Sequence, residues 1–293
     1  MDISFDIQSL KPVEHSIPPV STKLSRSDFW GAVKVRWGFG RNHYTVTPGL
    51  YKVGNPGSGS DVFVSANYKL SFDTLRKNLG SLDAWILVID TKGINVWCAA
   101  GKETFGTNNL VKSIKESSLQ FIVKHRSIIV PQLGAVGVTA HLVKKQTGFR
   151  VIYGTVRASD IKTFIQAGYK ATAEMREVMF PMHERAKLIP VDLMYRRYQL
   201  LLVLIGIFFI SGLDKSGFLF SRMITTSLYP VINIIGAYLS GIVLVPLFLP
   251  RIPFRAFALK GAFWGVISTV IKDIEAAWNV APAFVTVSSG PFR

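Results

Sequence analysis

The residue with the clearest chemical potential is Cys98, the single cysteine of the 293-residue chain, within the stretch Asn95–Lys102. One cysteine cannot form an internal disulfide bond. It also cannot supply the four thiolates that an iron–sulfur cluster usually needs. We therefore expect no iron–sulfur cluster on this chain, and any low-potential electron must come from another protein.

The surrounding residues predict that Cys98 lies in the first turn of a short helix. Trp85–Asp90 is apolar and is typical of a buried strand, and Asn95 is a favourable N-cap residue. Amide groups at a helix N-terminus carry partial positive charge, which favours a thiolate. The small residues 99–101 would let a large flat ligand approach the helix closely. Composition alone favours another interpretation, in which a lone cysteine beside Trp97 is a small buried apolar residue.

Other chemical motifs are weaker. Gly101-Lys102 lacks the upstream glycine and the following Ser or Thr of a phosphate-binding loop, and Gly57 and Gly59 lack the third glycine of a dinucleotide fingerprint. The histidines show no His-Glu-x-x-His spacing, so a zinc enzyme is not favoured. None of them lies in Asp-x-His-x-x-Gly, the pattern by which many cobalamin proteins supply a histidine ligand. The histidines are His15, His43, His125, His141 and His183.

The first part of the chain alternates strand and helix patterns, which predicts an α/β, Rossmann-like domain with a parallel sheet over residues 29–190. Residues 1–28 are expected to be a loose leader without a signal peptide. Ligands of such folds bind beyond the carboxyl ends of the strands. Predicted strands are Val62–Ser65, Trp85–Asp90, Ser127–Val130 and Arg150–Tyr153, with a hairpin of Val33–Trp37 and Tyr44–Val46; predicted helices run from Ser71 to Leu79, Thr107 to Glu116, Val138 to Lys145 and Ser159 to Gln166.

Residues 191–293 predict an all-α transmembrane domain. The blocks Gln199–Leu213, Tyr229–Leu249 and Phe254–Ile271 are nearly free of charge, and a helix needs about 20 apolar residues to cross a bilayer. Phe218–Leu228 contains Arg222 and is expected to be interfacial. Buried core helices of a soluble protein are the alternative.

Charge predicts the orientation of these spans. The basic residues on either side of the first two blocks fall on one side of the membrane, which the positive-inside rule makes cytoplasmic. We therefore expect a multi-pass protein of the cytoplasmic (inner) membrane with its α/β domain in the cytoplasm. The formal net charge of +16 fits binding to an anionic membrane surface. The sequence has no basic tract interleaved with aromatic residues, so binding to nucleic acid is not favoured. The basic residues are Arg196, Arg197, Arg251, Arg255 and Lys260.

The stretch around Cys98 also resembles a known family. All eight of its positions match the signature N-(V/I)-W-C-A-(A/G)-G-K of the mercury-methylating corrinoid proteins (HgcA family). Val64–Asp73 is similar to that family and to its relative, the large subunit of the corrinoid iron–sulfur protein. The matching residues are Asn95, Val96, Trp97, Cys98, Ala99, Ala100, Gly101 and Lys102.

The resemblance implies a cofactor, a reaction and partners. The cofactor would be a base-off, cobalamin-type corrinoid, with residues 95–102 as a cap helix under the ring and the Cys98 thiolate as the lower axial ligand of cobalt. The reaction would be methyl transfer to Hg(II), giving methylmercury. The partners would be a ferredoxin-like protein with two [4Fe–4S] clusters as electron donor and a folate-type methyl donor system. The family usually has about five spans and three are predicted here, so the membrane domain is either truncated or divergent.

Two other functions remain open at this point. The chain would serve as a membrane-bound corrinoid methyl carrier of one-carbon metabolism, or as a non-catalytic corrinoid-binding or transport protein. A neighbouring gene for a ferredoxin with two CxxCxxC motifs would favour mercury methylation, and one for a transporter ATPase would favour the last.

Overall fold

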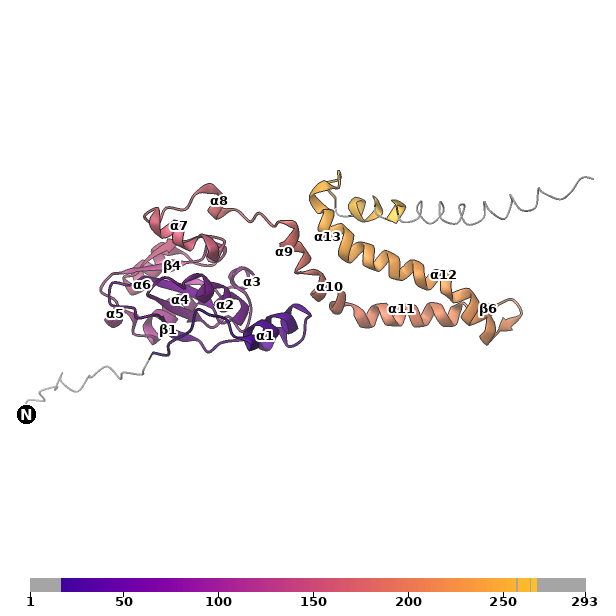
Figure 1. The fold of residues 1–293 in the computed structure, drawn as a ribbon, viewed down its shortest axis with the longest axis horizontal. Coiled ribbons are helices and arrows are strands. Elements are labelled where there is room, and N and C mark those ends of the chain that lie inside the picture. The colour runs from indigo at the N-terminus through magenta and orange to yellow at the C-terminus, as the bar shows by residue number, and fades with distance from the viewer. Residues whose placement is uncertain (1–16, 257, 264, 268–293) are drawn as a thin grey trace, which may run out of the picture. The chain divides into compact units, whose positions relative to one another are not determined.

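The protein is described by a computed structural model that covers residues 17–256, 258–263 and 265–267 (Figure 1). The chain divides into two compact units. The first, an α/β unit, contains residues 17–35 and 39–179 of the described part; the second, a helical unit, contains residues 36–38 and those from Phe180 onward.

The α/β unit is built on a five-stranded sheet in the order β1-β3-β2-β4-β5. Neighbouring strands run parallel except for the edge strand β1, which is antiparallel to β3. The parallel sheet predicted from the sequence is therefore confirmed, and the antiparallel edge strand was not predicted. The strands are β1 (Gly49–Val53), β2 (Val62–Ala66), β3 (Ala84–Ile89), β4 (Ser127–Val130) and β5 (Arg150–Tyr153).

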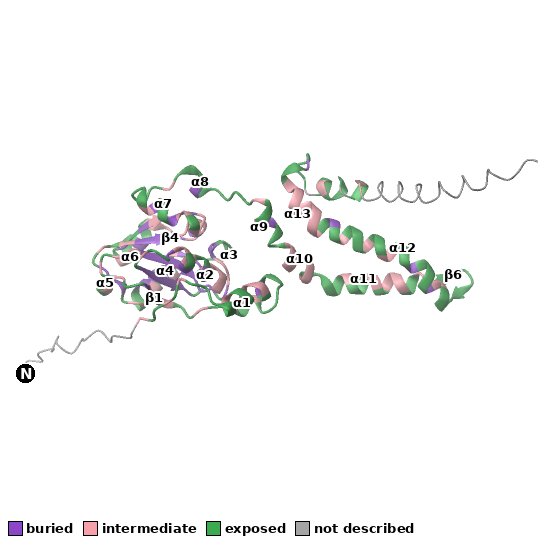
Figure 2. Ribbon diagram, in the orientation of Figure 1, coloured by how far each residue is buried: buried purple, intermediate pink, exposed green. Residues whose placement is uncertain are grey.

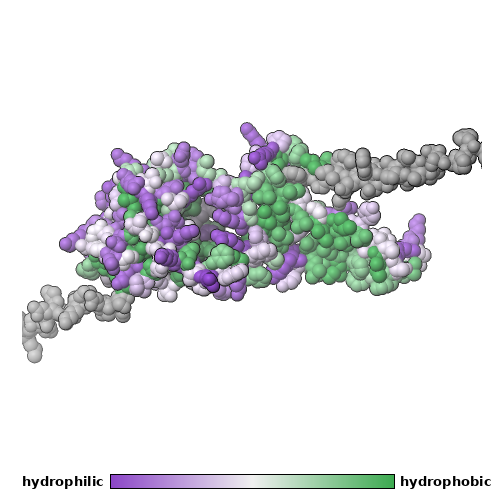
Figure 3. Space-filling model, viewed as in Figure 1, coloured by the Kyte–Doolittle hydropathy of each residue, from purple (hydrophilic) through white to green (hydrophobic). Residues whose placement is uncertain are grey.

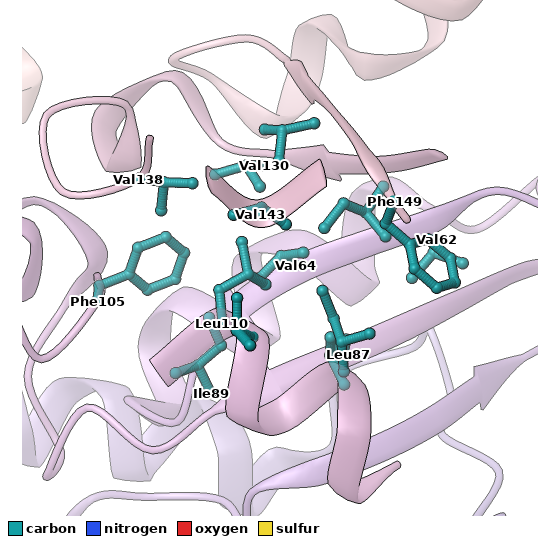
Figure 4. Packing of buried hydrophobic residues seen from close by; sticks show 14 of the residues in the cluster. Val62, Val64, Leu87, Ile89, Phe105, Leu110, Val130, Val138, Val143 and Phe149 are labelled. Carbon is teal, nitrogen blue, oxygen red and sulfur yellow. The ribbon is translucent and has the colours of Figure 1, made fainter. Parts of the chain in front are cut away.

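Helices cover both faces of this sheet. The strands β2 and β3 are therefore buried on both sides, and each of their residues is apolar or small. Figure 2 shows this buried layer between more exposed helices. Residues of α2 (Lys69–Asn78) and α7 (Ile161–Gln166) pack on one face, and residues of α4 (Thr107–Glu116) and α6 (Ala140–Thr147) on the other. Figure 4 shows the second layer, in which Leu110 and Val143 meet Val64 and Leu87.

The helices of the α/β unit largely follow the predicted pattern. Three predicted helices begin elsewhere: Tyr68 rather than Ser71 precedes α2, Gly106 rather than Thr107 precedes α4, and Asp160 rather than Ser159 precedes α7. The helices α1, α5 and α8 were not predicted. The helices and turns are α1 (Arg26–Arg36), η2 (Arg41–His43), α2 (Lys69–Asn78), α3 (Val96–Gly101), α4 (Thr107–Glu116), α5 (Leu119–Ile122), η3 (Gln132–Gly134), α6 (Ala140–Thr147), η4 (Ala158–Asp160), α7 (Ile161–Gln166) and α8 (Ala173–Arg176).

The predicted hairpin at residues 33–46 is wrong, because α1 occupies its first strand. Ser25 and Asp28 form a reciprocal capping box: the Ser25 amide donates to the Asp28 carboxylate at 2.9 Å, and the Asp28 amide donates to Ser25 Oγ at 3.1 Å. This exchange satisfies amides at the helix start and so favours a helix where the β-branched residues suggested a strand. Residues 44–46 contribute only an isolated bridge between Thr45 and Tyr68.

Of the expected leader, residues 1–16 lie outside the described residues, and residues 17–28 are held to the α/β unit by hydrogen bonds. The Val20 amide donates to the Lys52 carbonyl, and the Lys52 amide donates to the Pro18 carbonyl. Asp28 is paired with Lys69 at 2.5 Å and with Arg76 at 2.8 Å, and Asp73 pairs with the same two cations. Burial raises the pKa of Asp28, but hydrogen bonds from Lys69, Ser25 and Arg76 lower it by more, so that the pKa lies well below its usual value of 3.8.

This network predicts acid sensitivity. Because the folded-state pKa of Asp28 is depressed, its stabilisation is present above pH 3.8 and is lost as the pH falls below that value. We expect residues 1–190, expressed alone, to fold as a soluble domain whose free energy of unfolding in urea falls from pH 5 to pH 2. Asp28→Asn should be less stable near neutral pH, by about 3 kcal/mol if the network behaves as a buried ion pair, and less dependent on pH below 4. Equal acid dependence of both proteins would contradict this role.

Within the described residues, the helical unit contains one helix long and apolar enough to cross a membrane, Phe220–Arg251, with 32 residues and almost no burial. A second candidate exists only if the pair Met182–Tyr195 and Arg197–Ile210, bent by 54°, acts as one span. Figure 3 shows apolar side chains gathered over α11 and α12. The elements are α9 (Met182–Ala186), α10 (Ile189–Tyr195), α11 (Arg197–Ile210), β6 (Leu213–Asp214), β7 (Gly217–Phe218), α12 (Phe220–Leu239), η5 (Ser240–Leu244), α13 (Val245–Phe248) and η6 (Leu249–Arg251).

These elements differ from the three predicted spans. Most of the segment expected to be interfacial, Phe218–Leu228, is the first half of α12 and continues without a break into the second apolar block. The described part of the third block is a short apolar helix, Ala258–Ile267, and the rest of that block lies outside the described residues. One or two candidate helices, judged by length and composition, leave the membrane domain a proposal.

Candidate functional site

The helix α3 lies at the carboxyl edge of the sheet, directly after β3. It contacts β2 and the η3 turn that follows β4. From β2 the chain passes to β3 on one side, and the next strand, β4, pairs with β2 on its other side. This change of direction is the topological switch point at which ligands of such sheets bind. The predicted position of α3 is therefore confirmed, and it is a position suited to a ligand.

Asn95 starts this helix as predicted. Its side-chain Oδ1 accepts a hydrogen bond of 2.8 Å from the Cys98 amide. The cap satisfies one of the amides that the first turn leaves without a partner in the helix. The Cys98 amide is therefore fixed by Asn95, and the thiol is held at a defined place in the first turn.

The two faces of α3 carry different residues. Val96, Ala99 and Ala100 are buried and belong to the apolar core. Trp97, Cys98, Gly101 and Lys102 are exposed, and the exposed fraction of Trp97 is 67%. The interpretation of Cys98 as a small buried residue is wrong, because Cys98 is a free, exposed cysteine.

The small residues of α3 serve two purposes, of which the sequence suggested one. A Cβ atom at Gly137 would lie 3.1 Å from the Ala100 Cα, so the helix packs closely on the β4–α6 loop. Ala100 is therefore small because of this packing, and Ala99 and Ala100 are both buried in the core and do not face solvent. A Cβ atom at Gly101 would meet nothing within 4 Å, so only Gly101 leaves open space beside Cys98.

Asn67, at the end of β2, holds the loop between β3 and α3. Its Oδ1 accepts hydrogen bonds from the amides of Thr91 and Gly93, both at 3.0 Å, and its Nδ2 donates to Asp90 at 3.1 Å. The Thr91 hydroxyl lies 2.8 Å from Asn67 Oδ1 and 2.7 Å from the Ile94 carbonyl oxygen. Asn67 and Thr91 are both buried.

The same loop needs an unusual backbone. Lys92 has a φ of +56° and Gly93 a φ of +71°, in the left-handed region that favours glycine. A Cβ atom at Gly93 would lie 2.6 Å from the Asn42 carbonyl oxygen, so glycine is also required for space. We did not predict the roles of Asn67 and Gly93 from the sequence. An asparagine directly after a buried strand and a glycine before an N-cap were the available signals.

The sequence of the α/β unit is similar to known proteins. Residues 40–165 match the family of the CO dehydrogenase/acetyl-CoA synthase delta subunit. The α/β unit resembles corrinoid proteins. The large subunit of the corrinoid/iron–sulfur protein of Moorella thermoacetica is 30% identical over 120 residues, which are 40% of this chain and 26% of that protein.

Two archaeal relatives carry the same likeness. They are the gamma subunits of the acetyl-CoA decarbonylase/synthase complex of Methanocaldococcus jannaschii, 32% identical over 142 residues, and of Methanopyrus kandleri, 31% identical over 128 residues. The matches cover 47% and 43% of this chain. The chain spans only about a quarter of the length of these relatives, 28% and 27%. The narrower resemblance to mercury-methylating proteins rests on Asn95–Lys102 and stays a prediction.

The hydrogen bonds of Asn67 give a test of how the site is held. Asn67→Ala leaves buried amides of Thr91 and Gly93 without partners, which should destabilise the loop by about 1–3 kcal/mol. We expect faster amide hydrogen exchange over residues 91–98, measured by mass spectrometry, with the exchange of β4 unchanged. Asn78→Ala, whose side chain bonds only to the Thr74 carbonyl on the surface, is the control. Unchanged exchange over 91–98 in the Asn67 variant would contradict this role.

Proposed function

We propose that the α/β unit binds a corrinoid against the exposed face of α3, that the Cys98 thiolate is the lower ligand of its cobalt, and that the chain transfers a methyl group to Hg(II). The observation that carries the proposal is an exposed thiol, fixed by a helix cap at the switch point of the sheet, within a region that resembles corrinoid proteins.

The exposed face of α3 fits a large flat ligand. Trp97 offers an aromatic surface that solvent covers at present, and the open space at Gly101 lets a ring approach the backbone. Apolar surface in such an exposed position gains free energy when a ligand covers it. Cys98 supplies a sulfur donor beside both residues, and Lys102 at the end of the helix supplies a cation for the polar rim of a ligand.

The role of Cys98 is electronic. When bound, the corrinoid would supply a cobalt atom that accepts a methyl group and gives it up. A thiolate donates more electron density than the imidazole of a histidine. Hg(II) is an electrophile, so the methyl group must leave with its bonding electron pair, and a strong donor at Cys98 favours that direction of transfer. Asn95 keeps Cys98 in place, while the loop held by Asn67 keeps Asn95 in place.

The proposal requires two partners. Return of the cofactor to its reduced state needs an electron donor, for which we propose a ferredoxin-like protein with two [4Fe–4S] clusters. A folate-type system would supply the methyl group. We further propose that Phe220–Arg251 anchors the chain in the cytoplasmic membrane, with the α/β unit in the cytoplasm.

A second function is favoured by the names of the relatives. Subunits of the acetyl-CoA decarbonylase/synthase complex resemble the α/β unit, so the chain would instead carry methyl groups within one-carbon metabolism. That function involves methyl transfer without its bonding electron pair and places no requirement on a thiolate. The nature of the ligand below cobalt therefore separates the two functions.

Cobalt-edge X-ray absorption of the purified, corrinoid-loaded chain tests the ligand. We expect a base-off corrinoid with one sulfur neighbour at cobalt, because Cys98 is the only cysteine and is exposed. Cys98→Ala should lose the sulfur signal. A wild-type spectrum with only nitrogen or oxygen below the ring would contradict thiolate ligation and would favour the methyl-carrier function.

Activity of Cys98 variants tests the reaction. We expect Cys98→Ala to abolish methylmercury formation and Cys98→His to retain at most a small part, because histidine is a weaker donor with a larger ring. A loss of about 1.4 kcal/mol of transition-state stabilisation already reduces the rate tenfold. Asn95→Ala should be milder, since an N-cap contributes about 1 kcal/mol. The measurement is methylmercury produced by complemented cells, normalised to protein and corrinoid.

The control for these variants is Ser81→Ala, an exposed residue that lies before β3, at the opposite end of the strand from α3. It should retain wild-type activity. Near-wild-type activity of Cys98→Ala at equal corrinoid loading would remove the thiolate from the mechanism.

A further inference from the structure

Asp28, Gly31 and Val35 share one side of the helix α1, and the large apolar residues Phe29 and Trp30 lie exposed on the other. Val35 is 2% exposed. A Cβ atom at Gly31 would lie 2.5 Å from the Tyr44 hydroxyl, so the helix packs tightly on this side. Asp28, near the same side, forms the ion pairs with Lys69 and Arg76. The inner side of α1 is therefore fully engaged.

The outer side carries an aromatic pair. The exposed fractions of Phe29 and Trp30 are 60% and 66%, and their rings lie 5.5 Å apart in a T-shaped arrangement. Leu24 before the helix and Phe39 after it are also exposed. None of these side chains belongs to either apolar core of the unit. Large apolar residues that contribute nothing to a core and cluster on one surface indicate contact with another phase or molecule.

Cations flank this pair in the sequence, and Asp28 is the one acidic residue near it. Asp28 is the only acidic residue in the sequence between positions 17 and 60, and it is held by Lys69 and Arg76. The outward cations of this segment are therefore not offset by a nearby acidic side chain of the same segment. The exposed cations are Lys23, Arg26, Lys34 and Arg36.

We propose that this side of α1, defined by Phe29, Trp30, Arg26 and Lys34, docks on the surface of a membrane that contains acidic phospholipids. Tryptophan favours the headgroup region, where one part of the side chain meets apolar chains and another meets water, and the Phe29 ring adds apolar surface beside it. Cations near an anionic bilayer are attracted to its surface. Protein interfaces, in contrast, are depleted in lysine at their centre. Charge and ring placement on one short helix thus favour a lipid surface over a protein partner.

The docking would orient the α/β unit relative to the bilayer. The docking proposal rests on one part of the proposed function, the membrane location of Phe220–Arg251, and it does not require a bound corrinoid. A membrane anchor on the same chain raises the effective concentration of lipid near α1, so that a weak interfacial contact suffices.

The test uses the full-length chain in lipid nanodiscs. Phe29→Cys is made in a Cys98→Ser background and labelled with the environment-sensitive dye NBD; Glu116→Cys, on the exposed end of α4, is the matched control site. Nanodiscs contain phosphatidylcholine alone or mixed with phosphatidylglycerol, and a second set contains lipids with a doxyl quencher on the acyl chain. We expect blue-shifted emission and at least twofold stronger quenching at position 29 in the anionic discs, and no quenching at position 116.

A charge variant completes the test. Arg26→Glu with Lys34→Glu should return quenching at position 29 to the level in neutral lipid, as should added salt. No quenching at position 29 in anionic discs would overturn the proposal. Blue-shifted emission without quenching would also overturn it, because the dye at position 29 would then be covered by protein and not by lipid. Equal quenching at positions 29 and 116 would show a contact without specificity and would overturn it as well.

Alkaline extraction of cell membranes checks the anchor separately. Retention of the wild-type chain in the pellet supports the location of Phe220–Arg251. If alkali releases the chain, the anchor is wrong, and flotation of the same chain with phosphatidylglycerol vesicles decides the docking of α1: loss of flotation in Trp30→Ser supports it, and wild-type flotation of that variant overturns it.

Discussion

The carboxamide of Asn67 is the contact on which the rest of the site depends. The turn between β3 and α3 leaves the sheet, and its buried amides have no strand to pair with. One side-chain oxygen accepts from two of them, and the same side chain donates to Asp90. An unsatisfied buried amide costs free energy comparable to a lost hydrogen bond. The turn, the N-cap and the direction of α3 therefore depend on a residue that directly follows the neighbouring strand β2.

A second constraint is the closeness of backbone to backbone beneath α3. Gly137 approaches the Ala100 Cα, and a Cβ at Gly134 would lie 2.5 Å from the Phe105 ring. The helix is thus supported from below by the loop after β4 and from the side by β2. A short helix of six residues has little intrinsic stability. Contacts with the rest of the α/β unit keep this helix ordered. The exposed thiol of Cys98 is therefore held in place although the helix alone would not be stable.

Much of the α/β unit could be predicted from the sequence, and the failures have physical reasons. Strands β2 and β3, which are buried along their whole lengths, lie within one residue of their predicted bounds, and β4 and β5 match theirs. The β-branched residues of α1 imitated a strand, and only the Ser25–Asp28 capping box identifies the helix. The edge strand β1 was missed because Gly49–Val53 is only partly buried and alternates weakly.

The position of the candidate site was predicted from the sequence, but the residues that hold it in place were not. Asn95 and Cys98 were identified by residue type and spacing. Asn67 and Gly137 act through contacts across long sequence distances, which no local pattern contains. The helical unit was the least predictable, since composition gives the apolar content of Phe220–Arg251 but not where its helix is interrupted by the π-helical turn at Ser240–Leu244.

The exposure of Cys98 has a consequence for the order of events in a cell. A thiolate is a soft ligand, and Hg(II) is a soft ion that would bind it directly. An uncovered Cys98 would therefore be capped by the metal it is proposed to serve, and the chain would be poisoned by its own substrate. Under the proposed function, a cofactor seated on α3 shields the sulfur as a protecting group does in synthesis. Chains that bind the corrinoid before they encounter Hg(II) would remain able to transfer methyl groups, and chains that bind Hg(II) first would not.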